Sequence, residues 1–101
     1  MLLLARMLAG PMLWAALFSA VYGLHGAGCA LGWPAIATPL GPLHPAVMIA
    51  VWLAGLALHL ILMVSLPTGP ARAQRLPRMG AWIGLVASTV SLAPVVALST
   101  C

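Results

Sequence analysis

Three long apolar stretches, separated by segments rich in proline, glycine or arginine, dominate the sequence. They extend from about Leu4 to Gly28, from about Pro45 to Leu66 and from about Met79 to Leu98. About 20 apolar residues suffice for one membrane crossing, and backbone in lipid must be helical to satisfy its own hydrogen bonds. The pattern therefore predicts an all-α integral membrane protein with three transmembrane helices, forming a single membrane domain over residues 1–101.

The segments between the apolar stretches contain residues that end helices. Residues 30–44 include three prolines and two glycines, and residues 67–70 read Pro-Thr-Gly-Pro. Proline lacks an amide donor and its ring clashes with the preceding turn, so we expect neither segment to continue a helix. Both are predicted to be connecting loops, the second extending to about Arg78.

The charged side chains are few, and all of them are arginines: Arg6, Arg72, Arg75 and Arg78. Only 4% of the residues are charged, whereas a soluble domain has about a quarter, so an aqueous exterior is excluded. Four arginines also do not make the basic stripe of a nucleic-acid-binding protein. Arginines hold loops on the cytoplasmic side, which predicts a cytoplasmic N-terminus and a periplasmic C-terminus in a bacterial inner membrane.

The sequence contains no Asp or Glu. Proton-coupled transporters usually depend on an intramembrane acid, and hydrolases need a base with an orienting partner. We therefore expect a protein that is not an enzyme and has no catalytic residues, and a transporter or pore is the least favoured function.

Small residues recur at four-residue intervals on two of the predicted helices. Gly80, Gly84 and Ser88 form one such stripe on the third helix, and either Ala16 and Ala20 or Ser19 and Gly23 form another on the first. Close backbone approach is the main force that joins helices in lipid, so the stripe on the third helix is the best candidate for packing against a larger complex. The alternative is that glycine and alanine are simply common in membrane helices.

Two histidines and a cysteine fall at one predicted depth near the outer surface. His25 and Cys29 lie on one face of the first helix, and His44 begins the second. Two histidines at one level could ligate haem or copper, with Cys29 as a soft ligand. The alternative, which we favour, is interfacial histidines bonded to water or backbone, with neither a metal nor a required cofactor.

His59 lies within the hydrocarbon, about 10 Å from the cytoplasmic end of the second helix at 1.5 Å per residue. Its imidazole needs a partner, and Gly55 one turn away would let a neighbouring helix approach with a carbonyl or hydroxyl. Because no acid is present to share a proton, we expect a structural hydrogen bond and not a proton relay.

The two cysteines are predicted to form a disulfide. Cys29 follows the first helix and Cys101 follows the third, so the predicted topology carries both to the same face of the membrane. In a bacterium that face is the oxidising periplasm, where paired thiols close. The alternative is two free thiols.

The segment GPMLWAALFSAVYGLHGAGCALGW, residues 10–33, resembles the opening of small uncharacterised three-helix bacterial membrane proteins encoded beside haem-copper terminal oxidases. Those proteins often have a His-Phe pair where this chain has Leu17 and Phe18. The resemblance implies association with a respiratory complex in electron transport, and it supplies no catalytic residues.

These observations lead to one main hypothesis and two alternatives. The main hypothesis is a non-catalytic accessory subunit that packs against the helices of a larger energy-converting complex, first of all a haem-copper terminal oxidase. The first alternative is an accessory subunit of a photosynthetic reaction-centre or other electron-transfer complex. The second is a haem- or copper-binding membrane protein that uses His25 and His44.

The predicted topology can be tested with reporter fusions. A reporter that is active only in the periplasm should work after Cys101 and fail near Gln74, because the arginines around Gln74 hold that loop in the cytoplasm. Reporter activity measured in whole cells distinguishes the two positions, and the reverse pattern would contradict the three-helix topology.

Overall fold

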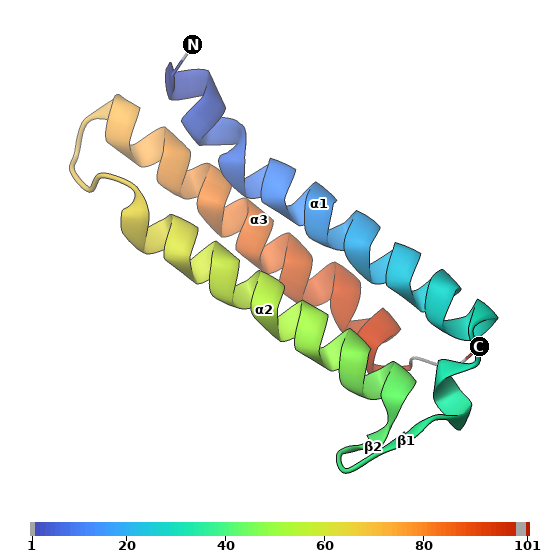
Figure 1. Ribbon diagram of the computed structural model, residues 1–101. Helices are drawn as coiled ribbons and strands as arrows, with labels where there is room; N and C mark the ends of the chain where they lie inside the picture. Colours follow the sequence, from blue (N-terminus) through green and yellow to red (C-terminus); the bar gives the residue numbers. More distant parts are fainter. Residues whose placement is uncertain (1, 99–100) are drawn as a thin grey trace.

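The computed structural model describes residues 2–98 and 101, and it contains three long helices (Figure 1). They are α1 (Leu2–Ala30), α2 (Leu43–Ser65) and α3 (Arg72–Ala97), and all three are long and apolar enough to cross a membrane. The prediction of an all-helical protein with three candidate membrane spans is therefore confirmed.

The three helices form an elongated bundle with principal extents of 52 × 22 × 18 Å. Figure 1 shows that α1 and α3 run in the same direction, whereas α2 runs back between their ends. Each helix contacts both of the others. Because α1 and α3 are parallel, Cys29 and Cys101 lie at the same end of the bundle.

The largest difference from the predicted boundaries is at the start of α3, which begins at Arg72 and not near Met79. The amides of Gln74 and Arg75 both bond to the carbonyl of Ala71, which starts the helix ahead of Pro77. The first four amides of a helix have no partner within it, so Pro77, the sixth residue, costs only one hydrogen bond. The arginines expected in a loop therefore lie on the first two turns of α3.

The connection between α1 and α2 contains short ordered elements. A 3-10 helix, η1 (Trp33–Ala35), precedes the strands β1 (Ala37–Thr38) and β2 (Gly41–Pro42), which pair antiparallel. Gly41 has a φ of 105°, a backbone conformation that residues other than glycine rarely adopt. The hairpin leads the chain directly into α2.

The closest helix contact joins α1 to α3 through glycines. A Cβ added to Gly10 would overlap the carbonyl of Gly80, one added to Gly84 would overlap the carbonyl of Gly10, and one added to Gly80 would overlap the carbonyl of Met7. The two backbones are therefore in direct contact. The expectation that the Gly80, Gly84 and Ser88 stripe meets a larger complex is wrong, because this chain's own α1 and α2 cover it.

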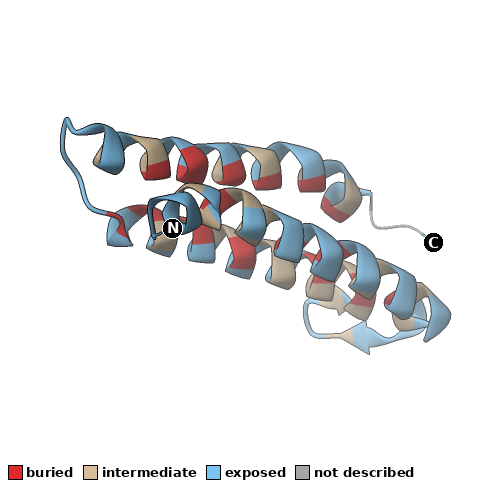
Figure 2. Ribbon diagram, turned by 90° about the horizontal axis from the view of Figure 1, so that it is seen from above, coloured by how far each residue is buried: buried red, intermediate tan, exposed pale blue. Residues whose placement is uncertain are grey.

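The remaining buried side chains gather along the inner faces of the helices, which Figure 2 shows as red patches facing the centre of the bundle. One apolar cluster comprises Leu17, Val21, Met48 and Leu92, and a second comprises Met63, Leu66 and Ala81. The outward faces carry large exposed apolar side chains, such as Val64 and Val90. An apolar exterior of this kind suits lipid or another membrane protein and not water.

The glycine contact predicts which glycines tolerate a larger side chain. Gly84→Leu should lower the free energy of unfolding by about 1–3 kcal/mol or more, because leucine at this position forces the α1 and α3 backbones apart. Gly23→Leu is the matched control, since a Cβ there meets no described atom within 4 Å. Thermal unfolding in detergent, followed by circular dichroism, measures both variants. Equal melting temperatures would contradict the contact.

Candidate functional site

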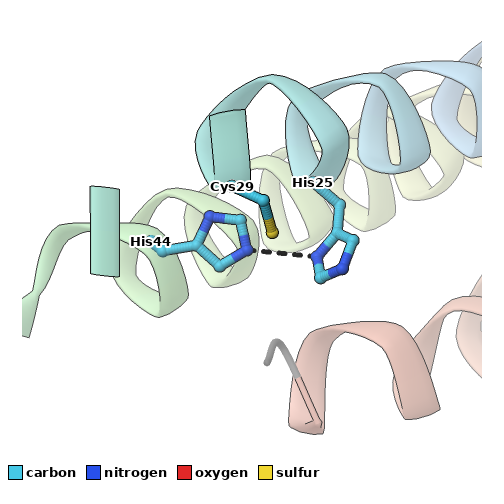
Figure 3. Close-up of side chains that lie close together, drawn as sticks. All are labelled: His25, Cys29 and His44. Atoms are coloured by element: carbon cyan, nitrogen blue, oxygen red, sulfur yellow. Dashed lines mark hydrogen bonds between the residues drawn. The ribbon is translucent and has the colours of Figure 1, made fainter. Parts of the chain in front are cut away.

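His25, Cys29 and His44 converge at the end of the bundle where α1 joins α2 (Figure 3). One ligand atom from each residue lies within 4.8 Å of the corresponding atoms of the other two. A hydrogen bond of 3.1 Å joins His44 Nε2 to His25 Nδ1. The sequence predicts that His25, Cys29 and His44 lie at one depth, and in the structure their side chains are close together.

Local sequence explains the convergence. His25 and Cys29 are one helical turn apart on α1, so their side chains share a face. A Cβ added to Gly28 would overlap the rings of both His44 and Trp33. Gly28 therefore creates the space in which the His44 ring lies against the α1 backbone.

The His44 ring is fully buried, with a relative exposure of 0%. Its Nδ1 atom has no hydrogen-bond partner among the described residues. The ring is therefore held by its single hydrogen bond to His25 and by contacts with its neighbours, including Trp33, whose ring centre is 6.3 Å away. The Nδ1 atom of His59 is likewise buried without a partner among the described residues, so this feature alone does not mark a site.

The structure joins Cys29 to Cys101 in a disulfide, as predicted from the topology, and the two Cα atoms are 5.6 Å apart. The bond connects the last turn of α1 to the segment that follows α3. Figure 3 shows the Cys29 sulfur between the two imidazole rings in that view. The disulfide is therefore an immediate neighbour of the histidine pair.

His59 makes its contact with α3, away from this cluster. Its Nε2 atom and the Ser88 hydroxyl share a hydrogen bond of 2.7 Å, and both residues are fully buried. The partner is a hydroxyl from a neighbouring helix, as expected. Gly55 admits a different helix, because a Cβ there would overlap Leu17 of α1. The arrangement clamps α2 to α3.

The arginines of α3 line a hollow at the opposite end of the bundle. The lining residues are Thr68, Gly69, Arg72, Arg75, Leu76, Arg78, Met79 and Trp82. Arg78 also donates a hydrogen bond to the carbonyl of Met63. The sequence has no acidic side chain to neutralise these cations, so anions from outside the chain, such as lipid phosphates, are their natural counter-ions.

Two functionally placed residues, Gly10 and Gly28, were not singled out from the sequence. Each is a glycine inside a predicted helix, where alanine would be more favourable by about 1 kcal/mol. A glycine inside a helix indicates that another group approaches the backbone closely at that position, but it does not identify the group. The structure supplies the answer: α3 approaches Gly10, and His44 approaches Gly28.

Comparison with protein-family models, curated proteins and solved structures found no match to this chain.

The disulfide can be tested by alkylation. Maleimide should label neither cysteine of the denatured chain before reduction and both cysteines after it. Cys101→Ser should also lower the free energy of unfolding by up to about 4 kcal/mol, because the bond closes a loop whose ends are 72 residues apart. Full labelling without reductant, measured by mass spectrometry, would contradict the bond.

Proposed function

We propose that this chain is a non-catalytic accessory subunit of a larger energy-converting complex in a bacterial inner membrane. A haem-copper terminal oxidase is the first candidate, in keeping with the resemblance of residues 10–33. In this proposal the N-terminus is cytoplasmic, and the subunit acts by packing against and stabilising its neighbours.

An unoccupied ridge of small residues on α1 carries the proposal. Ala15, Ser19, Gly23 and Ala27 are spaced four residues apart, and all four are exposed. A Cβ added to Gly23 would meet no described atom within 4 Å, so the backbone is open there. Small residues at this spacing are typical of surfaces where another helix approaches.

The contact between α1 and α3 supports this interpretation of the ridge. Where Gly10, Gly80 and Gly84 meet inside the bundle, this chain uses glycines to bring two backbones together. The ridge offers similar small residues on the outside, and no helix among the described residues lies upon it. A transmembrane helix of another subunit is the partner that such a surface fits.

The hollow lined by Arg72, Arg75 and Arg78 supports the proposed orientation. The cytoplasmic leaflet of a bacterial membrane carries anionic lipids, and each arginine near that surface contributes about 1 kcal/mol of attraction. An orientation with this end in the cytoplasm places the arginines beside anionic lipid headgroups. The reverse orientation opposes the usual excess of positive charge on the cytoplasmic side.

Purification from native membranes tests the proposal. The chain, tagged at its N-terminus and expressed in its own host, should be recovered in mild detergent together with the subunits of one complex, identified by mass spectrometry. Gly23→Leu should reduce that recovery about tenfold or more, since losing about 1.4 kcal/mol of contact energy weakens binding tenfold.

Ala57→Leu provides the control, because it makes the same kind of change at an exposed small residue of α2. It should leave recovery unchanged. Oxidase subunits among the recovered proteins would identify the partner as proposed. Recovery of photosynthetic or other electron-transfer subunits would support the accessory role but identify a different partner complex. Recovery of the chain alone would refute the accessory role.

A further inference from the structure

We propose that reduction of the Cys29–Cys101 disulfide opens a metal site in which His25, Cys29 and His44 bind one closed-shell ion, Cu⁺ or Zn²⁺. The inference goes beyond the accessory role and does not depend on it. It rests on the contact between the two histidines and on the position of the Cys29 sulfur, which together place three ligand atoms within 4.8 Å of one another.

The chemistry of the three side chains selects the kind of ion. Two imidazoles and one thiolate form a donor set that suits Cu⁺ and Zn²⁺, whereas Mg²⁺ and Ca²⁺ prefer oxygen ligands. The sequence has no Asp or Glu, so it offers no such oxygen donors from acidic side chains. The cluster is therefore suited to a thiophilic ion.

The distances suit a single ion. Two nitrogens bound to one tetrahedral Zn²⁺ at about 2.0–2.1 Å are about 3.3 Å apart. His25 Nδ1 and His44 Nε2 are 3.1 Å apart. In the oxidised chain one of these nitrogens carries a hydrogen and donates a hydrogen bond to the other. In the metal-bound chain that hydrogen would lie on the other nitrogen of the same ring, so that both facing nitrogens direct lone pairs at the ion. The histidine pair therefore needs only a small displacement to become two ligands.

The disulfide controls whether the third ligand is present. In the oxidised chain the Cys29 sulfur is bonded to Cys101, and a thiolate, not a disulfide sulfur, is the strong metal ligand. Cys29 lies one turn from His25 on the same helix, so cleavage of the bond leaves its sulfur beside the imidazoles. Reduction thus adds a ligand without requiring a change of fold.

The reaction balances with a dithiol as the reductant. A dithiol donates two electrons and two protons to the Cys29–Cys101 bond, which gives two thiols, and the dithiol becomes a disulfide. The Cys29 thiol then releases one proton to water as its sulfur binds the ion. Cu⁺ is satisfied by the three ligands, whereas Zn²⁺ takes a fourth, supplied by water or by the freed Cys101, whose thiol then also releases its proton to water.

Metal binding to the purified full-length chain in detergent tests the inference. The chain is reduced with a dithiol, freed of reductant under anaerobic conditions, and titrated separately with Cu⁺ and Zn²⁺ against a chromogenic competitor. The reduced chain should bind one ion at least tenfold more tightly than the oxidised chain. The ion that gives the larger difference identifies the metal.

Two serine variants separate the role of Cys29 from general effects of reduction. Cys101→Ser leaves Cys29 as a free thiol, so it should bind the ion without any reductant. Cys29→Ser also lacks the disulfide, but it should bind at least tenfold more weakly than Cys101→Ser. Circular dichroism checks that both variants retain their helices.

His25→Gln tests the imidazole arm, and His59→Gln is its matched control, because His59 lies on α2 bonded to Ser88, outside the cluster. Only His25→Gln should weaken binding in the reduced chain. Equal affinity of the oxidised and reduced chains, or equal affinity of the two serine variants, would overturn the inference. No binding by the reduced chain would also overturn it. The native complex plays no part in these measurements, so they are independent of the accessory role.

Discussion

The close approach of α1 and α3 at Gly10, Gly80 and Gly84 leaves no space for side chains between the two backbones. In lipid, apolar surface gains nothing by leaving water, so contact of this kind supplies much of the force that holds helices together. It also fixes the two helices in parallel register. Their ends then coincide, which brings Cys29 and Cys101 within bonding distance and directs Ser88 toward α2.

Neutral hydrogen bonds provide specificity within that frame. Ser88 of α3 bonds to both polar side chains of α2 that reach it, through its hydroxyl to His59 and through its carbonyl to Trp52. Trp14 of α1 donates to the hydroxyl of Ser91, one turn further along α3. Bonds between membrane helices contribute about 0.6–2 kcal/mol each. A chain without acidic residues thus joins its three helices without ion pairs between carboxylates and arginines.

The sequence predicts the number of helices, which depends on composition, and the end of the bundle at which each cysteine lies, which depends on the number of crossings. Proline and glycine clusters separate three apolar stretches, and two predicted crossings lie between Cys29 and Cys101, so both cysteines are expected at one end. Spacing also predicts that the stripe of Gly80, Gly84 and Ser88 is a packing face. Spacing does not say which helix covers it, because the same small residues fit an internal neighbour or a foreign one.

The convergence of His25 and His44 depends on the conformation of the intervening loop, which the sequence does not fix. The start of α3 differs from the prediction because the segment that contains the three arginines, expected to be a loop, is helical from Arg72, and Pro77 is tolerated so close to the N-terminus of a helix. At the candidate metal site the residue types were evident beforehand. The sequence does not show that Gly28 leaves the space in which the His44 ring reaches His25 and Cys29.

The position of Cys101 beyond α3 gives the disulfide a bearing on how the protein is made. In the proposed orientation, Cys101 reaches the outer compartment only after α3 has crossed the membrane. In that orientation the disulfide can form only after insertion of α3 is complete. Once closed, the bond turns the segment from Cys29 to Cys101 into a covalent ring, and α3 can no longer be drawn back through the bilayer separately from α1. A protease that extracts membrane proteins from the cytoplasmic side would have to pull two crossings at once.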